Sequence, residues 1–355
     1  MFNIAVFIDN LKIGGIQKSI INILNNIDLN RYNVDLYLFD DDIFYKDALP
    51  GNVRIIKLKK HNKLFKFINF DICYNLAKKP LFDREYDIAI DFDTYQFNTA
   101  YSALKCPSKR KIMWIHNDVV EESKYNFKYS VLHHFMKGKY KYFDEFVGVS
   151  EGVIEPFKLK NRVSGKNFCV IPNFVDTDEI FNKSLEEFND VKIDETKYNL
   201  VSTGRLCLQK GYDIFLKKYK DIVSKRKDIH FYLIGDGEDK DKLLKLVREY
   251  NLKDYVTFLG KKENPFKYER LMDAFVLTSR YEGQGIAILE AYALGLDIFI
   301  SRNIEKYNGC DIKASLDIVS DIINANKKET KEFHDLKKYN MNVLNSLISL
   351  LENKH

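Results

Sequence analysis

Short apolar runs alternate with helix-forming segments along the first half of the chain. Seven runs have the length of buried strands: residues 3–9, 34–39, 53–58, 87–92, 111–116, 145–150 and 168–173. They are continuous and bounded by turns, as expected for strands buried on both faces of a parallel sheet. Helical segments such as SIINILNNI lie between them. The pattern predicts an α/β domain whose helices cover a parallel sheet on both faces.

The second half repeats this pattern. Its predicted strands are residues 199–204, 230–235, 255–260, 274–279 and 297–302. No convincing strand follows, and residues 336–355 form an amphipathic helical pattern. We therefore expect two Rossmann-like domains that face each other across a central crevice, where the carboxyl ends of their strands bind a ligand.

The expected domain boundaries follow from these patterns. The N-terminal domain covers residues 1–175 and the C-terminal domain residues 198–335. Residues 176–197 are acidic and poorly periodic, which favours a linker. The helix at 336–355 is expected to pack back on the N-terminal domain.

Composition narrows the class of protein. The 355 residues are 45% hydrophobic and 30% charged, which is typical of globular domains. No apolar run is long enough to predict a membrane span, and MFNIAVFIDN begins directly as a strand, without the features of a signal peptide. The cysteines at 73, 106, 169, 207 and 310 form no CxxC pair, which favours reduced thiols and a cytoplasmic location.

Positive charge is concentrated in the N-terminal half. Residues 1–175 hold 26 Lys and Arg against 20 Asp and Glu. Residues 54–70 contain six of these cations and residues 123–143 contain five, without any acid and with many aromatic residues. Such stretches suit anionic lipid headgroups at the inner face of a membrane, or phosphorylated acceptors. Ordinary solvated faces remain the alternative, and nucleic acid is not expected because no nucleic-acid-binding motif accompanies the charge.

Residues 279–291, SRYEGQGIAILEA, carry the main candidate chemistry. Gly283, Gln284 and Gly285 follow a predicted strand and precede the helix that begins at Ile286. Glycines let backbone amides approach a ligand, and the first amides of a helix bind anions. The stretch therefore predicts a diphosphate site. Glu290, one turn into the helix, could bind ribose hydroxyls.

Several motifs occur in an order that resembles a known family. They are GGIQKS, WIHND, IPNFVDTDEIF, STGRLCLQKGYD, LIGDGE, FLG and SRYEGQGIAILEA. The chain is similar over nearly its whole length to the GT4-type retaining glycosyltransferases of bacterial surface polysaccharides, which have the GT-B fold. Gln284 departs from the apolar residue that is common in the family.

The resemblance implies roles for the charged residues. Glu282 would hold a hydroxyl of the donor sugar, and Glu290 the ribose. Arg205 and Lys210 match cations that stabilise the departing diphosphate, as oppositely charged groups would at developing negative charge. As ordinary surface residues, all four would have no such role.

The resemblance also implies roles for other residues. His116 would contact the donor sugar, although a histidine at the end of a strand can serve structure alone. The Gly14-Gly15 turn would face the donor phosphates and the acceptor. Backbone contacts with the donor are expected at Gly204, Gly237, Gly260, Gly283, Gln284, Gly285 and Ile286.

No metal or other cofactor is expected. The sequence DFD at 91–93 imitates the metal-binding motif of a different glycosyltransferase fold, but it ends a strand in the N-terminal domain. We interpret it as strand termination. In this interpretation, Arg205 and Lys210 do the work of a metal.

The predicted function is that of a retaining glycosyltransferase. It would transfer a hexose or N-acetylhexosamine from a nucleotide sugar, UDP-linked rather than GDP-linked, to a lipid-linked cell-surface glycan. The alternatives are a sugar-nucleotide epimerase of the same fold and a catalytically silent scaffold that binds glycan or membrane.

Overall fold

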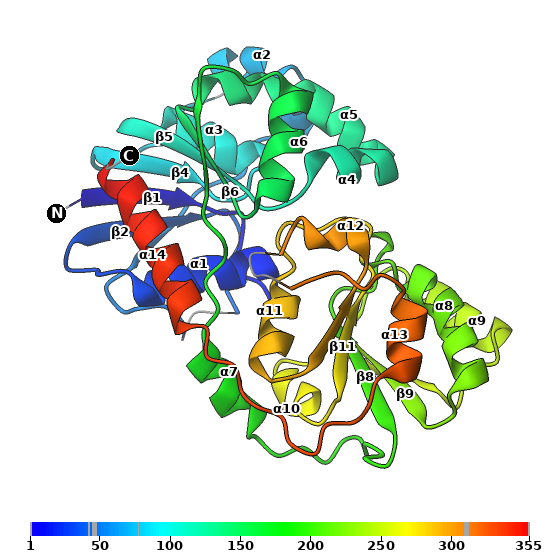
Figure 1. The fold of residues 1–355 in the computed structure, drawn as a ribbon. Coiled ribbons are helices and arrows are strands. Elements are labelled where there is room, and N and C mark those ends of the chain that lie inside the picture. Colours follow the sequence, from blue (N-terminus) through cyan, green and yellow to red (C-terminus); the bar gives the residue numbers. More distant parts are fainter. Residues whose placement is uncertain (1, 42, 45–47, 77, 309–311, 354–355) are drawn as a thin grey trace. The chain divides into compact units, whose positions relative to one another are not determined.

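The computed structural model describes residues 2–41, 43–44, 48–76, 78–308 and 312–353. Contacts divide the chain into two compact units. Unit 1 consists of Met1–Phe174 together with Lys338–His355, and unit 2 consists of Val175–Lys337. Each unit is built around its own parallel sheet (Figure 1).

Unit 1 contains a seven-stranded sheet with the order β3-β2-β1-β4-β5-β6-β7. Its strands are β1 (Phe2–Phe7), β2 (Tyr32–Leu38), β3 (Arg54–Lys57), β4 (Tyr86–Asp91), β5 (Ser108–Ile115), β6 (Glu145–Gly148) and β7 (Asn167–Val170). Every neighbouring pair is parallel. All seven strands predicted for this half are confirmed.

The helices of unit 1 connect these strands and include the C-terminal helix. They are α1 (Gly15–Asn26), η2 (Lys63–Phe67), α2 (Phe70–Leu76), α3 (Phe97–Lys105), α4 (Val119–Tyr125), α5 (Phe127–Met136), η3 (Lys137–Tyr142), α6 (Glu151–Asn161) and α14 (Lys337–Glu352). Arg110 donates hydrogen bonds to the carbonyl groups of Leu350 (2.9 Å) and Leu351 (3.3 Å). These bonds satisfy carbonyl groups at the end of α14, which are otherwise left without helical partners.

A buried ion cluster lies in the middle of β2. Asp35 is fully buried and accepts hydrogen bonds from the guanidinium groups of Arg54 and Arg84 and from the Tyr86 hydroxyl at 2.5 Å. Burial alone would raise the pKa of the Asp35 carboxyl, but the hydrogen bonds from Arg54, Tyr86 and Arg84 lower it below its usual value. The cluster therefore stabilises an ionised carboxylate inside unit 1.

Unit 2 contains a five-stranded parallel sheet with the order β10-β9-β8-β11-β12. Its strands are β8 (Tyr198–Thr203), β9 (Ile229–Ile234), β10 (Val256–Gly260), β11 (Ala274–Leu277) and β12 (Asp297–Ile300). Its helices are α7 (Thr177–Ser184), η4 (Leu208–Lys210), α8 (Tyr212–Lys225), α9 (Lys240–Glu249), α10 (Phe266–Glu269), α11 (Ile286–Ala293), α12 (Arg302–Glu305) and α13 (Ile318–Asn324). The five strands predicted for this half are confirmed.

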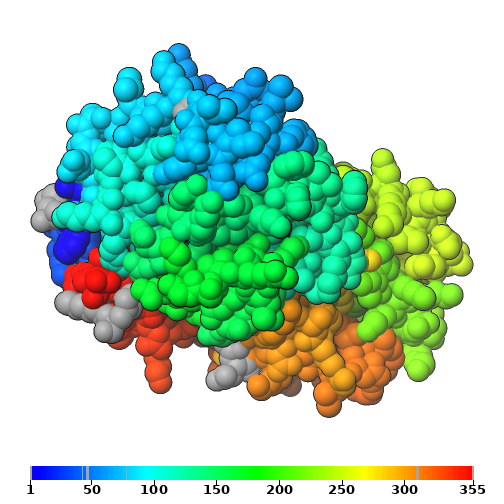
Figure 2. Space-filling model, turned by 90° about the horizontal axis from the view of Figure 1, so that it is seen from above, coloured from blue at the N-terminus to red at the C-terminus, as the bar shows by residue number. Residues whose placement is uncertain are grey.

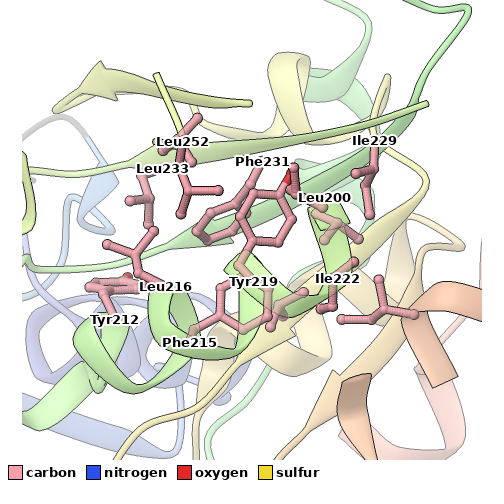
Figure 3. Close-up of a cluster of buried hydrophobic side chains, with 14 of the residues drawn as sticks. Leu200, Tyr212, Phe215, Leu216, Tyr219, Ile222, Ile229, Phe231, Leu233 and Leu252 are labelled. Atoms are coloured by element: carbon pink, nitrogen blue, oxygen red, sulfur yellow. The ribbon is translucent and has the colours of Figure 1, made fainter. Parts of the chain in front are cut away.

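One face of this sheet is packed by α8. The apolar side of the helix presents Phe215 and Tyr219 to Phe231 of β9 (Figure 3). The rings of Phe215 and Phe231 meet edge to face with centroids 4.7 Å apart. This core fixes the sheet, and hence the positions of the loops that leave its carboxyl edge.

The segment predicted as a linker, 176–197, is partly helical. Helix α7 begins after Asp176, whose side chain accepts a bond from the Glu179 N–H at 2.9 Å. The helix buries Ile180 and packs against α10 and α11 of unit 2. Its acidic first turn stabilises the helix N-terminus, since carboxylates there interact favourably with the helix dipole. Three acids of this segment, Asp176, Asp178 and Glu179, thus belong to the capped start of a helix.

Candidate active site

The strand order of unit 2 reverses between β8 and β11. From β8 the chain proceeds outward through β9 to β10, and then returns to the other side of β8 as β11. In open parallel sheets, ligands bind at the carboxyl edge where the order reverses. The loops after β8 and β11, residues 204–211 and 278–285, leave the sheet at this point. They contain most of the site residues predicted in this half.

Glycines bring the loops together, backbone against backbone. Gly211 has φ +66°, and a Cβ there would lie 2.2 Å from the carbonyl oxygen of Thr278. A Cβ at Gly235, in the loop after β9, would lie 1.9 Å from the carbonyl oxygen of Gly204. Only glycine fits such approaches without displacing backbone. The predicted donor-site residue Gly237 is packed in the same way against Leu206.

Lys210 and Glu282 join the two loops directly. Lys210 Nζ donates to Glu282 Oε1 at 2.8 Å, and Ser279 Oγ donates to the same oxygen at 2.5 Å. The side chains of Lys210 and Glu282 are 17% and 7% exposed. Burial alone would lower the pKa of the Lys210 ammonium, but the charge of Glu282 raises it above its usual value. The site therefore contains a charged lysine in a poorly solvated place, where its field is strong.

Arg205 lies on the same loop but is more accessible. Its side chain is 72% exposed and pairs with Glu238 of the loop after β9, with Nη2 and Oε2 3.0 Å apart. An exposed pair of this kind contributes little to stability, so it can open without much cost. Arg205 could therefore leave Glu238 and pair with an anionic ligand instead.

Helix α11 begins where the second loop ends. Gly285 is its N-cap residue with φ +74° and, as a glycine, has no side chain to cap the helix. Gln284, just before it, is buried. Gly260, another predicted contact, has φ +71° and accepts a bond from Gly235 N–H at 2.9 Å. The diphosphate site at this helix start stays a prediction.

Glu290 is half-buried on α11, with a second acid in its vicinity. That acid, Glu269, is 2% exposed and accepts a bond from Thr203 Oγ1 at 2.5 Å. Burial raises the pKa of Glu269 to about 8, and the charge of Glu290 adds to the effect. Sequence patterns did not suggest Glu269, because nothing marks a single acid on a short helix as buried.

A set of hydrogen bonds that joins the two loops was also not predicted from the sequence. Arg280 donates two hydrogen bonds of 2.8 Å to Asp213 of α8 and one of 2.6 Å to the carbonyl of Leu208. Gln209 Nε2 donates to the carbonyl of Tyr281 at 3.1 Å. These bonds fix the loops that carry Lys210 and Glu282. Ser279 and Arg280 are the first two residues of the SRYEG motif, so their position in the sequence could have indicated a role in the site.

The other predicted site residues belong to unit 1. Gly14 is the N-cap of α1, and a Cβ at Gly15 would meet no atom within 4 Å. His116 follows β5 and packs against Phe92, with ring centroids 4.6 Å apart. Burial lowers the pKa of His116 to about 3, so its imidazole is neutral. Its Nε2 has no hydrogen-bond partner among the described residues.

The DFD residues end β4, as predicted, and both carboxyl groups are buried. Asp91 and Asp93 lie close to the ammonium group of Lys139, which is itself 1% exposed. Within the described ranges, no group of three or more His, Cys, Asp or Glu side chains has the arrangement of a metal site. The four cysteines that the structure describes are free thiols, and Cys310 lies outside the described residues.

Several cations of the two basic stretches are buried or paired. Lys139 is buried, Lys60 pairs with Asp9 at 3.2 Å, and Lys141 pairs with Asp71 at 2.9 Å. The paired acids are distant in the sequence, so the sequence alone does not show which cations of these stretches are compensated.

These features define the class of protein. Two Rossmann-like units, the second with a lysine–glutamate pair and a helix N-terminus at its switch point, have the architecture of GT-B glycosyltransferases. A solved structure, Anabaena Alr3699/HepE in complex with UDP-glucose, has a TM-score of 0.62 with 14% sequence identity, covering 98% of this chain and 100% of that one. This likeness establishes the GT-B fold.

Sequence comparisons agree with the fold. Residues 183–307 match the family described as glycosyl transferases group 1. An uncharacterized glycosyltransferase of Methanocaldococcus jannaschii is 29% identical over 53% of this chain and 47% of its own length. A Campylobacter jejuni protein is 25% identical over 82% of this chain and 79% of its own length. It is named N-acetylgalactosamine-N,N'-diacetylbacillosaminyl-diphospho-undecaprenol 4-alpha-N-acetylgalactosaminyltransferase. The matches support a glycosyltransferase.

Proposed function

We propose that this protein transfers a sugar from a UDP-sugar to a lipid-linked glycan of a cell-surface polysaccharide, with retention of configuration at the anomeric carbon. One observation carries the proposal. The switch point of unit 2 brings together a half-buried lysine, a glutamate and the start of a helix, with Lys210 and Glu282 2.8 Å apart. Diphosphate and sugar are the two parts of a donor that such groups would bind.

The donor would lie across the two loops. Its diphosphate would accept hydrogen bonds from the amides of residues 283–286 and face Lys210 and Arg205. Glu290 would accept bonds from the ribose hydroxyls. Glu282, held by Ser279 and Lys210, would accept a bond from a hydroxyl of the sugar. Lys210 would thus contact both Glu282, which binds the sugar, and the diphosphate, which is the leaving group.

The reaction would proceed on one face of the sugar. The bond from the anomeric carbon to the diphosphate oxygen breaks while the acceptor hydroxyl forms a new bond to that carbon. The hydroxyl proton passes to the leaving diphosphate. Negative charge grows on the diphosphate during this step, so Lys210 and Arg205 would stabilise the transition state more than the bound donor. The same cations would replace a metal ion.

The relatives favour a transferase over the two alternatives. Both relatives described above are named glycosyltransferases, and the name of the Campylobacter jejuni protein includes diphospho-undecaprenol, a lipid diphosphate. Neither an epimerase nor a silent scaffold is supported by these comparisons. The intact Lys210–Glu282 pair also argues against a silent scaffold, since a buried ion pair is costly to keep without use.

The test is an activity screen with purified full-length protein. Donors would be UDP-N-acetylgalactosamine, UDP-N-acetylglucosamine, UDP-glucose, UDP-galactose and GDP-mannose. The acceptor probe would be a decyl diphosphate that carries one N-acetylgalactosamine. We expect acceptor-dependent UDP release and a new α-linkage, at equal rate with and without EDTA. Sugar epimerisation without release, or absence of both reactions over the whole panel, would contradict the proposal.

Unit 1 would bring the enzyme to its lipid-linked acceptor. Apolar side chains stand exposed on η2, α2 and α5: Leu64 (63%), Phe67 (43%), Ile72 (52%), Leu76 (77%) and Phe127 (83%). Lys63 and Lys128 are exposed among them. Helix α5 contacts η2, and α2 contacts both η2 and η3, so the elements form one surface, which we call the basic-apolar face (Figure 2). None of the helices that the structure describes could span a bilayer, judged by length and apolarity.

Vesicle sedimentation tests this membrane role. Each cation near an anionic surface contributes about 1 kcal/mol, so replacing Lys63, Lys66 and Lys128 with Gln should weaken binding to phosphatidylglycerol vesicles roughly a hundredfold. Lys217, Lys218 and Lys220 of α8, exposed in unit 2, provide a control with the same loss of charge. Binding should fade as salt rises. Equal binding to phosphatidylcholine vesicles, or equal loss in the control, would reject the basic-apolar face as the membrane surface.

A further inference from the structure

The sheet of unit 1 also has a switch point. Its strand order reverses between β1 and β4, so the loops after these two strands flank the place where such sheets bind ligands. The loops are joined directly, because Asp9 N–H donates to Asp93 Oδ2 at 3.0 Å. The loop after β1 leads to Gly14, the N-cap of α1. The turn after β4, residues 92–95, is therefore at the ligand edge of unit 1.

This turn contains a strained residue. Thr94 has φ +46°, although a β-branched side chain rarely adopts the left-handed region. It is fully buried, and its hydroxyl donates to the carbonyl of Trp114. Tyr95 continues the turn and donates to the carbonyl of Asn117 at 2.7 Å. Strain of this kind persists only where the surrounding structure enforces it.

Two buried groups enforce it. Lys139 of η3 is 1% exposed, and its ammonium donates to the Thr94 carbonyl. Asp91, fully buried, accepts hydrogen bonds from the backbone N–H groups of Asp93 (3.3 Å) and Thr94. Burial lowers the pKa of Lys139 to about 8, which shows how unfavourable its position is for a charge. An apolar residue would leave the neighbouring Asp91 and Asp93 carboxyl groups without a cation and the Thr94 carbonyl without this donor, so the bond to the turn and the two acids together explain the lysine.

The turn presents one carboxyl group at the ligand edge. Asp93 is 8% exposed, in contrast to the fully buried Asp91. Burial raises the pKa of Asp93 to about 7, with smaller contributions from Asp91 and Asp9. Its Oδ2 accepts the hydrogen bond from the Asp9 N–H at 3.0 Å. A hydroxyl group is the ligand that suits a single, poorly solvated carboxylate.

We propose that Lys139 is a positioning residue that holds the 92–95 turn in its left-handed form, so that Asp93 accepts a hydrogen bond from a sugar hydroxyl of the acceptor. The inference rests on the proposed function for the nature of the acceptor. It assigns to unit 1 a residue that contacts substrate and a buried residue that acts through it. Neither was predicted from the sequence.

A double substitution tests the role of Lys139. Lys139→Met removes the bond to the turn, whereas Thr94→Gly removes the strain, because glycine adopts positive φ without cost. Loss of the bond to the turn should raise amide exchange at residues 92–96, and the acceptor KM, about tenfold in Lys139→Met, which corresponds to about 1.4 kcal/mol. The double variant Lys139→Met/Thr94→Gly should recover most of both. Lys141→Met is the matched control, since Lys141 lies on the same η3 with 59% of its side chain exposed.

The measurements are hydrogen exchange by mass spectrometry, and KM and kcat with the decyl diphosphate acceptor described above. The donor KM should change less than the acceptor KM in Lys139→Met. Asp93→Asn should raise the acceptor KM without raising exchange at 92–96. Unchanged exchange in Lys139→Met, or no recovery in a folded double variant, overturns the positioning role. An unchanged acceptor KM in Asp93→Asn overturns the contact.

Failure of the proposed function would look different. If the wild-type protein transfers no sugar from any donor in the panel, the assignment of Asp93 to an acceptor falls with the transferase itself. The exchange measurements still decide whether Lys139 holds the turn. If Lys139→Met does not fold, the folded double variant and Asp93→Asn carry the test, because restored folding by Thr94→Gly itself demonstrates that Lys139 offsets the strain.

Discussion

Lys210→Ala is the most informative substitution in unit 2, because stability and turnover should respond separately. The change leaves the Glu282 carboxylate 7% exposed without its cation, although Ser279 still donates to it. Removing one partner of a buried pair typically costs about 3–5 kcal/mol. Because Lys210 retains 17% exposure, we expect the lower end, about 3 kcal/mol. At roughly 2–4 °C per kcal/mol, the melting temperature of the unit should fall by about 6–12 °C.

The effect on turnover has a different origin. Losing one electrostatic stabiliser of a developing negative charge reduces kcat about a hundredfold or more. Glu282→Gln in the Lys210→Ala background removes the uncompensated charge, so the double variant should recover most of the lost stability. It should not recover turnover, because the cation remains absent. Calorimetry and initial rates at saturating donor measure the two effects independently.

Lys183→Ala is the control for both measurements. Lys183 pairs with Glu179 on α7 at 2.6 Å, with 42% of its side chain exposed. An exposed pair on a helix contributes only about 0.3–0.5 kcal/mol, so both stability and turnover should stay near wild type. A Lys210→Ala protein with normal turnover at saturating donor would refute the assignment of Lys210 to the leaving diphosphate.

Three further predictions concern single positions. Glu290→Ala should weaken binding of free UDP about ten- to hundredfold in calorimetry, the scale of one or two bonds to a charged group; unchanged UDP affinity would remove the ribose assignment. Arg205→Ala should lower kcat about a hundredfold, whereas Glu238→Gln should leave kcat unchanged, since it only frees Arg205 from an exposed pair. Asp35→Ala should destabilise unit 1 by about 1–3 kcal/mol in denaturant titrations, because Tyr86 loses its acceptor while the two arginines remain partly exposed, against under about 1 kcal/mol for Asp83→Ala, whose side chain is 58% exposed. The Asp35 pKa is lowered on folding, so its contribution is present above the ordinary carboxyl pKa of about 3.9 and is lost as pH falls through the folded value; destabilisation by Asp35→Ala that is equal at pH 3 and pH 7 would contradict this.

The sheets were predictable because their strands are continuous apolar runs. The errors lie mainly at the carboxyl ends. Residues 274–279 were predicted as a strand, but β11 ends at Leu277. Thr278 and Ser279 continue the pattern yet leave the ladder, and bond to the Gly211 carbonyl at 3.1 Å and to Glu282 at 2.5 Å. An apolar run does not reveal where the sheet ends and the site begins, because both are buried.

Buried charge was the other limit of the sequence. Lys139 lies in KGKYKY among other lysines, and nothing in its spacing distinguishes it from its exposed neighbour Lys141. The same holds for Glu269 on α10. Their burial depends on partners far along the chain: Thr94 is 45 residues from Lys139, and Thr203 is 66 residues from Glu269. Only the topology brings such residues together.

Each switch point has a lysine beside carboxyl groups, but the two lysines differ in exposure. In unit 2, Lys210 keeps 17% of its side chain exposed beside Glu282, as the proposed contact with a diphosphate requires. In unit 1, Lys139 is 1% exposed beside Asp91 and Asp93, so no ligand can touch it. A charge that is accessible can stabilise a transition state, because its field acts on the reacting atoms. A buried charge can act only through the groups to which it is hydrogen-bonded. For Lys139, that group is the carbonyl of the strained Thr94.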